Sequence, residues 1–235
     1  MKDRSRDNTI LGAERVLAYS EGLRTYMLSV YNYMALGLGL TGGVAFLVVS
    51  SPTLMATLMP MMWLFLIAPI ALVFFLSFKI NTMQFSTAQS VFWLYAALNG
   101  VAFSTLFLQF QGESIARVFF ITAGMFAAMS LYGYTTRKDL TSMGGFLFMG
   151  LIGIIIASVV NMFIGSSGFQ FLISIIGVVV FTGLTAYDTQ SIKETYVAGS
   201  STEISGKRAI FGALRLYLDF INLFLMLLQL AGDRR

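Results

Sequence analysis

Two long stretches without a charged side chain constrain what this chain can fold into. Residues 25–78 and 140–187 contain no Asp, Glu, Lys or Arg. A helix needs about 20 apolar residues to cross the hydrocarbon core of a membrane, so each stretch is long enough for two crossings. Of all residues, 57% are hydrophobic and 11% are charged, which is unlike a water-soluble protein. The sequence therefore predicts an all-α, polytopic integral membrane protein.

Polar clusters, glycine and proline divide the apolar sequence into seven segments. The predicted spans are residues 27–49, 58–78, 88–109, 115–135, 143–163, 169–190 and 210–231. Residues 1–24 carry many charged side chains before the first span, so we expect a retained cytoplasmic tail there rather than a cleaved signal peptide. Residues 25–235 are expected to form one seven-helix transmembrane domain.

Basic residues predict which way this bundle faces, because Lys and Arg concentrate in cytoplasmic loops. The tail and alternate links carry Lys2, Arg4, Arg6, Arg15, Arg24, Lys79, Arg137, Lys138, Lys193, Lys207 and Arg208. The other side carries Arg117, Arg234 and Arg235. We therefore expect a cytoplasmic N-terminus and, after seven crossings, a C-terminus on the outside. A re-entrant last segment, with both ends cytoplasmic, is the alternative that the basic C-terminus leaves open.

The absence of Cys and His excludes several classes of enzyme. Thiolate metal sites, zinc-dependent membrane hydrolases and Ser-His proteases all require one of these residues. An intramembrane aspartyl protease is not supported either, because LYLD at 216–219 replaces the glycine-flanked motif expected around the second aspartate. The scattered basic residues do not indicate nucleic-acid binding. We expect no enzyme, no cofactor and no nucleic-acid partner; the lipid bilayer is the predicted surrounding.

Two aspartates lie inside predicted spans: Asp188 in LTAYDTQSIK and Asp219 in LRLYLDFINLFLMLLQL. A carboxylate at membrane depth is costly unless it is protonated, paired or hydrated, so such residues usually mark function. If the sixth helix continues past Gln190, the two carboxyl groups can meet. They would then share a proton and form a pH-controlled latch between the sixth and seventh helices.

A purely structural role is the alternative for both aspartates. Asp188 would pair with Lys193 or cap a neighbouring helix, and Asp219 would be neutralised by Arg215 one helical turn earlier. This alternative predicts two separate ion pairs and no contact between the carboxyl groups.

Other conspicuous motifs predict structure rather than chemistry. In TTRKDLTS, Asp139 precedes the fifth predicted helix and is expected to cap it. Small residues at four-residue spacing predict close helix contacts within one bundle. The positions are Gly39 with Gly43, Gly124 with Ala128, Gly177 with Phe181 and Thr182 close by, and Ala209 with Ala213.

Three strings resemble a known family. GLTAYDTQSIKETY, GALRLYLDFINLFLMLLQLAG and YGYTTRKDLTSMGGFLFMGLIGIIIASVVNMF resemble the Bax inhibitor-1 family and, more narrowly, its bacterial YccA-like branch. The resemblance covers all seven spans and is weakest in residues 1–24. It implies a multi-pass protein of a bacterial inner membrane, in which a central, strongly apolar helix is wrapped by the others.

The resemblance also implies a function. In this family the aspartates of the YD and LDFIN motifs form a di-aspartyl pH sensor that gates a calcium leak. Asp188 and Asp219 would be this sensor, Lys79 would latch onto it, and calcium would be a permeant ion that contacts the aspartates transiently rather than a resident metal. Arg215 is a second expected charge partner, close enough to Asp219 to keep that acid ionised.

One departure from the family bears on the ion. Calcium-leak members carry a glutamate in the second helix, whereas this chain has no acidic residue between Glu21 and Glu113. Because calcium favours carboxylate ligands, this loss weakens the assignment of calcium and leaves the pH sensor intact. The alternative is a regulatory membrane protein that binds partners. Bacterial members are associated with a membrane-bound ATP-dependent protease, and residues 1–24 would be the contact.

Overall fold

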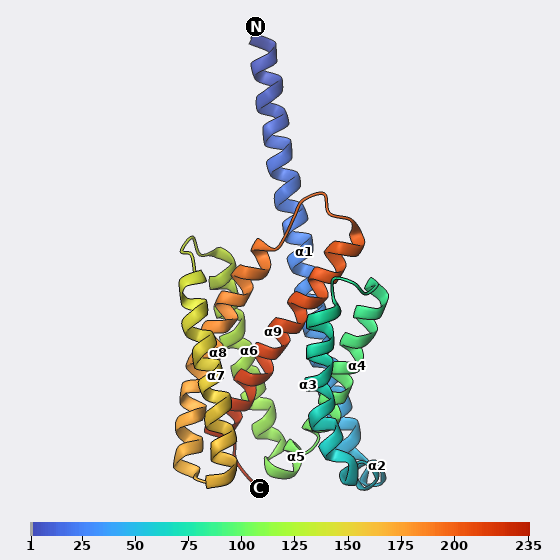
Figure 1. Cartoon of the computed structure of the whole chain (residues 1–235), viewed down its shortest axis with the longest axis vertical. Helices are drawn as coiled ribbons and strands as arrows, with labels where there is room; N and C mark the ends of the chain where they lie inside the picture. Colours follow the sequence, from blue (N-terminus) through green and yellow to red (C-terminus); the bar gives the residue numbers. More distant parts are fainter. Residues whose placement is uncertain (1) are drawn as a thin grey trace.

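The computed structural model describes residues 2–235, with side chains from Leu17 onward, as helices joined by short turns (Figure 1). The helices are α1 (Lys2–Ser50), α2 (Pro52–Leu58), the 3-10 turn η1 (Met59–Met61), α3 (Met62–Lys79), α4 (Phe85–Phe103), α5 (Leu106–Gln109), α6 (Gly112–Thr135), α7 (Thr141–Ile164), α8 (Ser167–Glu194) and α9 (Thr202–Ala231). Within the described residues, seven spans are long and apolar enough to cross a membrane. The predicted all-α, seven-helix architecture is confirmed.

The ends of three helices differ from the prediction. The expected tail is helical, because α1 begins at Lys2 and runs without a break into the first span. α8 ends at Glu194, beyond the predicted span, and so meets the condition that the sixth helix continue past Gln190. α9 begins at Thr202 rather than near residue 210. The start of α9 is set by a cap, since the Ser201 side chain accepts the Ile204 N–H at 3.3 Å. Capping operates outside the apolar region, so hydropathy alone places this start too late.

α9 is the central helix of the bundle. It crosses obliquely between a layer of α1, α3 and α4 and a layer of α6, α7 and α8 (Figure 1), and it contacts α1, α3, α4, α6 and α8. α9 is the most deeply buried span, as the family resemblance implies, but it is not the most apolar. The most apolar spans are α3 and α7, which are the least buried. Contact with lipid favours apolar side chains on the outside of the bundle, whereas a helix enclosed by protein can carry polar side chains.

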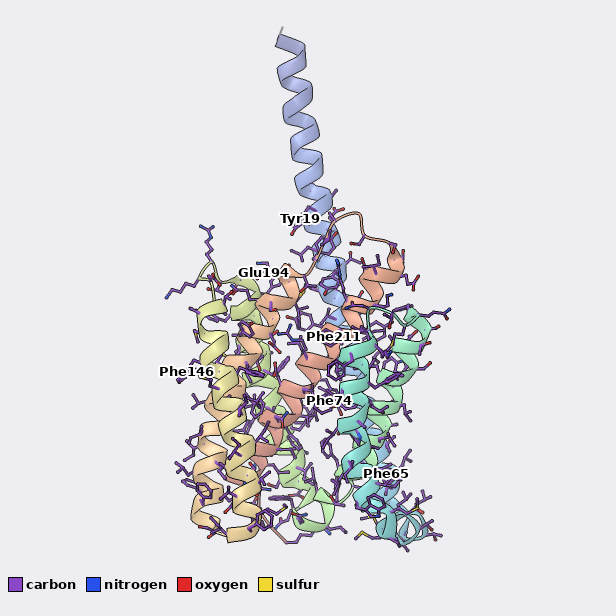
Figure 2. All side chains as sticks on the ribbon, in the orientation of Figure 1. Tyr19, Phe65, Phe74, Phe146, Glu194 and Phe211 are labelled. Carbon is purple, nitrogen blue, oxygen red and sulfur yellow. The ribbon has the colours of Figure 1, made fainter. Side chains whose placement is uncertain are left out.

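The outer surface of α7 illustrates the lipid-facing chemistry. Phe146 projects from the edge of the bundle (Figure 2) and is 72% exposed, and Phe163 is 82% exposed. Such exposure of large apolar side chains is unfavourable in water and is expected in hydrocarbon.

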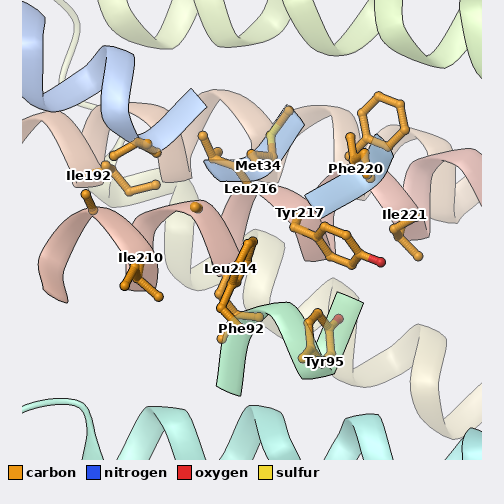
Figure 3. Packing of buried hydrophobic residues seen from close by; sticks show 14 of the residues in the cluster. Met34, Phe92, Tyr95, Ile192, Ile210, Leu214, Leu216, Tyr217, Phe220 and Ile221 are labelled. Carbon is orange, nitrogen blue, oxygen red and sulfur yellow. The ribbon is translucent and has the colours of Figure 1, made fainter. Parts of the chain in front are cut away.

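The face of α9 toward α1 and α4 is an aromatic core that ends in a neutral polar network. Tyr217 of α9 lies beside Phe92 and Tyr95 of α4 (Figure 3), with its ring 5.2 Å from that of Tyr95. The Tyr217 hydroxyl is 2.7 Å from the Thr41 hydroxyl of α1, which lies 2.8 Å from the Ala96 carbonyl oxygen. The polar groups joined by these hydrogen bonds, two hydroxyls and a backbone carbonyl, are all uncharged.

The two ends of the chain lie at opposite ends of the bundle (Figure 1). α9 is a continuous helix of 30 residues, so the re-entrant alternative for the last segment is wrong. Beyond α9, the Gln111 N–H donates to the Asp233 carbonyl at 3.0 Å and Arg235 N–H donates to the Gln109 carbonyl at 3.0 Å. An exposed ion pair of 2.7 Å joins Arg117 to Asp233. The C-terminus is therefore bound to the turn between α5 and α6.

The expected close helix contact occurs at Gly177, where a Cβ would lie 2.7 Å from the Met226 side chain of α9, but not at the other expected glycines. Gly39, Gly43 and Gly124 face open space, so the predicted packing role is wrong for them. A Cβ on Gly133 of α6 would instead lie 2.2 Å from the carbonyl oxygen of Ala186 in α8. Sequence spacing identifies a small-residue face but not whether protein or lipid covers it.

Candidate functional site between α7, α8 and α9

A cavity of about 840 Å³ lies between α7, α8 and α9. Most of its wall is apolar, but its polar lining includes Asp188, Arg215, Asp219, Asn222 and Ser158. It also reaches Gly144, near the first turn of α7 and hence near the N-terminal end of the bundle. The cavity thus brings the two predicted aspartates together and adds a basic residue.

Arg215 forms an ion pair with Asp188 across the contact between α9 and α8. The Arg215 Nε donates to Asp188 Oδ2 at 3.2 Å, and a second guanidinium nitrogen donates to Asp188 Oδ1. The third nitrogen donates to the Ser191 Oγ at 3.2 Å. The side chains of Arg215 and Asp188 are 28% and 12% exposed. This bidentate geometry is the strong form of an Arg–carboxylate interaction, and it fixes α9 against α8.

Asp219 lies beside this ion pair without a comparable partner. It is 5% exposed, and as a carboxylate its buried Oδ2 atom has no donor in reach. Its carboxyl group adjoins that of Asp188, close enough for a hydrogen bond between the two when one of them carries a proton, and it also lies near Arg215. Two carboxyl groups and one guanidinium therefore share one buried site.

Helix geometry explains this meeting. Arg215 and Asp219 are four residues apart, so they lie on one face of α9, and Asp188 and Ser191 share a face of α8 in the same way. Asp188 is near the end of α8, whereas Asp219 is beyond the middle of α9. Because α9 crosses the bundle obliquely (Figure 1), its middle reaches the end of α8.

The charge partners differ from those expected. Arg215 pairs with Asp188 on the neighbouring helix rather than with Asp219 on its own. Lys193 does not pair with Asp188, because its ammonium donates to the Tyr134 carbonyl at 2.8 Å. Lys79 is exposed in the last turn of α3, and no ion pair among the described side chains joins it to either aspartate. Of the two expected charge partners, Arg215 therefore contacts the aspartate pair, and Lys79 does not.

Two polar residues of the site were not predicted. Ser191 holds the third nitrogen of Arg215, and its spacing of three residues from Asp188 is the signal that could have identified it. Gln190 is buried and holds the link between α6 and α7: its Oε1 accepts the Leu140 N–H at 2.8 Å and its Nε2 donates to the Lys138 carbonyl at 2.8 Å. These bonds fasten a surface link to the part of α8 that carries Asp188.

In the link between α6 and α7, the Asp139 carboxylate accepts a hydrogen bond of 2.8 Å from the backbone N–H of Thr141, at the start of α7. Hydrogen bonds from the Thr141 side chain and backbone hold the pKa of the Asp139 carboxyl below its ordinary value. Asp139 therefore bonds to the first residue of α7, but the N-cap is Leu140, so the expected capping role of Asp139 is wrong.

The donor set of the site suits protons better than a resident metal ion. The aspartates offer four carboxyl oxygens, and Arg215 binds both oxygens of Asp188. Calcium takes roughly six to eight oxygen ligands. Within the described residues, no group of three or more His, Cys, Asp or Glu side chains is placed to hold a metal ion.

The sequence matches known proteins along most of its length. The family described as "Inhibitor of apoptosis-promoting Bax1" matches residues 23–235. The uncharacterized protein RP147 of Rickettsia prowazekii is 49% identical over 231 residues, covering 97% of each chain. The inner membrane protein YbhL of Escherichia coli is 47% identical over 219 residues, covering 91% of this chain and 94% of YbhL. This chain therefore belongs to the Bax inhibitor-1 family of membrane proteins.

Proposed function

We propose that the protein is a pH-sensitive cation leak, with calcium as the permeant ion, gated by Asp188 and Asp219. The observation that supports this proposal most is the second buried carboxyl group, Asp219, which lies within hydrogen-bond reach of Asp188 beside an existing ion pair and has no cationic partner of its own. A structural ion pair would not need a second buried carboxyl group. Catalysis and a cofactor form no part of the proposal.

The charges of the site give the gate its direction. With Asp219 protonated, Asp188 and Arg215 neutralise each other and the site carries no net charge. When Asp219 loses its proton, a negative charge remains in a buried site, which is unfavourable without water or a cation. Rising pH is therefore expected to loosen the contact between α8 and α9 and to admit hydrated cations.

The location of the site supports control from one side of the membrane. Lys79, Arg137, Lys193 and Lys207 lie at or near helix termini at the N-terminal end of the bundle, which we therefore assign to the cytoplasm of a bacterial cell. The cavity of the aspartates reaches the start of α7 at the same end. Cytoplasmic pH is the signal that this arrangement favours.

Calcium flux into liposomes tests the proposal, measured from about pH 5 to 8. We expect the flux of the unaltered chain to rise with pH, and Asp219→Asn to give a low flux that no longer depends on pH. Asp233→Asn is the matched control, because it makes the same substitution at a carboxylate that is exposed at the opposite end of the bundle. Absence of flux above empty liposomes, or an unchanged pH profile in Asp219→Asn, would contradict the proposal.

A second candidate is regulation through a bound partner. α1 projects well beyond the other helices (Figure 1), where a part of a partner protein that lies outside the membrane can reach it. A membrane-bound ATP-dependent protease is the partner class that this reading favours. Co-purification of such a protease with the full chain, and its loss when residues 2–16 are deleted, would support it. The same deletion should leave calcium flux unchanged if the leak is a separate activity.

A further inference from the structure

A second cavity, of about 460 Å³, lies at the N-terminal end of the bundle between α1, α3, α8 and α9. Three cationic side chains line it: Lys207, Arg208 and Arg215. Among the side chains that the structure describes, from Leu17 onward, no acidic one contributes to its wall. This cavity, here called the vestibule, shares Arg215 with the aspartate site and is otherwise separate from it.

The cations of the vestibule are weakly satisfied. The Lys207 ammonium lies 3.2 Å from the Met83 carbonyl oxygen and 3.7 Å from Glu203, whose side chain is 58% exposed. The Arg208 guanidinium reaches the Thr195 carbonyl at 3.3 Å and Ser200 at 3.5 Å. These distances are long for charge-assisted hydrogen bonds, which are normally about 2.7–2.9 Å. Both side chains therefore retain donors for a stronger acceptor.

Other groups converge on the same space. Tyr26 of α1 lines the vestibule together with Arg208 and Arg215, and its hydroxyl interacts electrostatically with both guanidinium groups. Ile80, Ile192 and Phe211 form apolar parts of the wall. The vestibule thus combines several hydrogen-bond donors, positive charge and apolar surface, which is typical of pockets that bind small organic anions.

We propose that the vestibule binds a phosphate group through Lys207, Arg208 and the edge of Arg215 that faces away from Asp188. Arginine binds phosphate through paired N–H donors, and lysine binds it as a point charge. The phosphate belongs either to a soluble organic phosphate or to a lipid headgroup, with its organic part against the apolar wall. The site stands whether or not the chain conducts ions.

The test measures binding of inorganic phosphate to the full chain in nanodiscs of zwitterionic phosphatidylcholine, at constant ionic strength. We expect saturable binding, weakened at least about tenfold in a Lys207→Gln, Arg208→Gln double variant, because each loses a charge-assisted hydrogen bond. The control is Arg137→Gln with Lys138→Gln, which removes two positive charges from the same end of the bundle outside the vestibule. No saturable binding, or equal weakening in both double variants, overturns the proposal.

Ile204→Glu is a second variant that removes none of these contacts. It adds a carboxylate to the vestibule wall, where Ile204 is 44% exposed, and should abolish phosphate binding. Undiminished binding in this variant also overturns the proposal. Nanodiscs that contain phosphatidic acid then distinguish the two sources. If phosphatidic acid weakens the binding of inorganic phosphate, the site is assigned to a lipid headgroup. If phosphatidic acid leaves that binding unchanged, the site is assigned to a soluble phosphate.

Discussion

Tyr217 and Asp219 lie two residues apart on α9 and point into opposite layers of the bundle. On the Tyr217 side, the Thr41 hydroxyl lies 2.7 Å from the tyrosine hydroxyl and 2.8 Å and 2.9 Å from the carbonyl oxygens of Ala96 and Gly37. On the Asp219 side, one ion pair is formed and a second buried carboxyl group beside it has no cationic partner of its own. A satisfied neutral network has one preferred arrangement, whereas a site with a missing partner can exchange protons, water or ions. One helix thus carries a fixed face and an adjustable face.

The largest effect should come from breaking the ion pair of the adjustable face. Arg215→Gln leaves Asp188 as an uncompensated buried charge, so the free energy of unfolding should fall by about 3 kcal/mol near neutral pH. SDS titration in mixed micelles measures this change. Arg117→Gln is the matched control, because its ion pair with Asp233 is exposed on both sides and should be worth less than about 1 kcal/mol. Equal losses in the two variants would show that burial does not strengthen the Arg215–Asp188 pair of the adjustable face.

Packing between α6 and α8 should rank second. Gly133→Ala places a methyl group against the backbone of Ala186, which cannot move aside, and should cost about 2 kcal/mol. Thermal unfolding in detergent detects the loss. Gly39→Ala adds the same methyl group in open space and should not destabilise the protein. A milder effect at Gly133 than at Gly39 would show that the layer behind Asp188 is loosely packed.

A smaller change is expected on the fixed face. Tyr217→Phe removes one hydrogen bond but leaves Thr41 bonded to backbone carbonyls, so the loss should be about 1 kcal/mol. The pH profile of calcium flux should be unchanged. Tyr132→Phe, at a ring that is 43% exposed, is the control for loss of a hydroxyl. A shifted pH profile in Tyr217→Phe would mean that the two faces are coupled.

The smallest effect should occur at Asp139, outside both faces. Because folding lowers the pKa of this carboxyl, its contribution to stability is present above its ordinary pKa of 3.8 and is lost as pH falls through the lower folded value. Asp139→Asn should therefore slightly lower the melting temperature at neutral pH and converge on the unaltered chain in strong acid. Two curves that stay parallel over the whole pH range would contradict this account.

The spans were predicted well because their signal is local, and the same local signal places the two aspartates inside them. Charge-free runs identify helices in lipid, and an isolated Asp within such a run is conspicuous whatever its neighbours are. The partner of Arg215 was not predictable in this way. Asp219 is its neighbour on the same helix, but Asp188 is preferred because the oblique crossing of α9 brings the end of α8 within reach of both guanidinium edges. Tertiary geometry also decides which glycines face protein, as at Gly133, and which face lipid, as at Gly39.

The two hydrogen bonds of Gln190 give the buried site a mechanical connection to the outside. They attach the link between α6 and α7 to α8 two residues beyond Asp188, so a displacement of α8 must carry this link with it or break the bonds. If Asp219 loses its proton and α8 moves, as we propose, an environment-sensitive fluorophore attached in place of Arg137, on an exposed part of the link, should change its emission. Through Gln190, a movement of α8 inside the bundle is coupled to a segment at the surface of the protein.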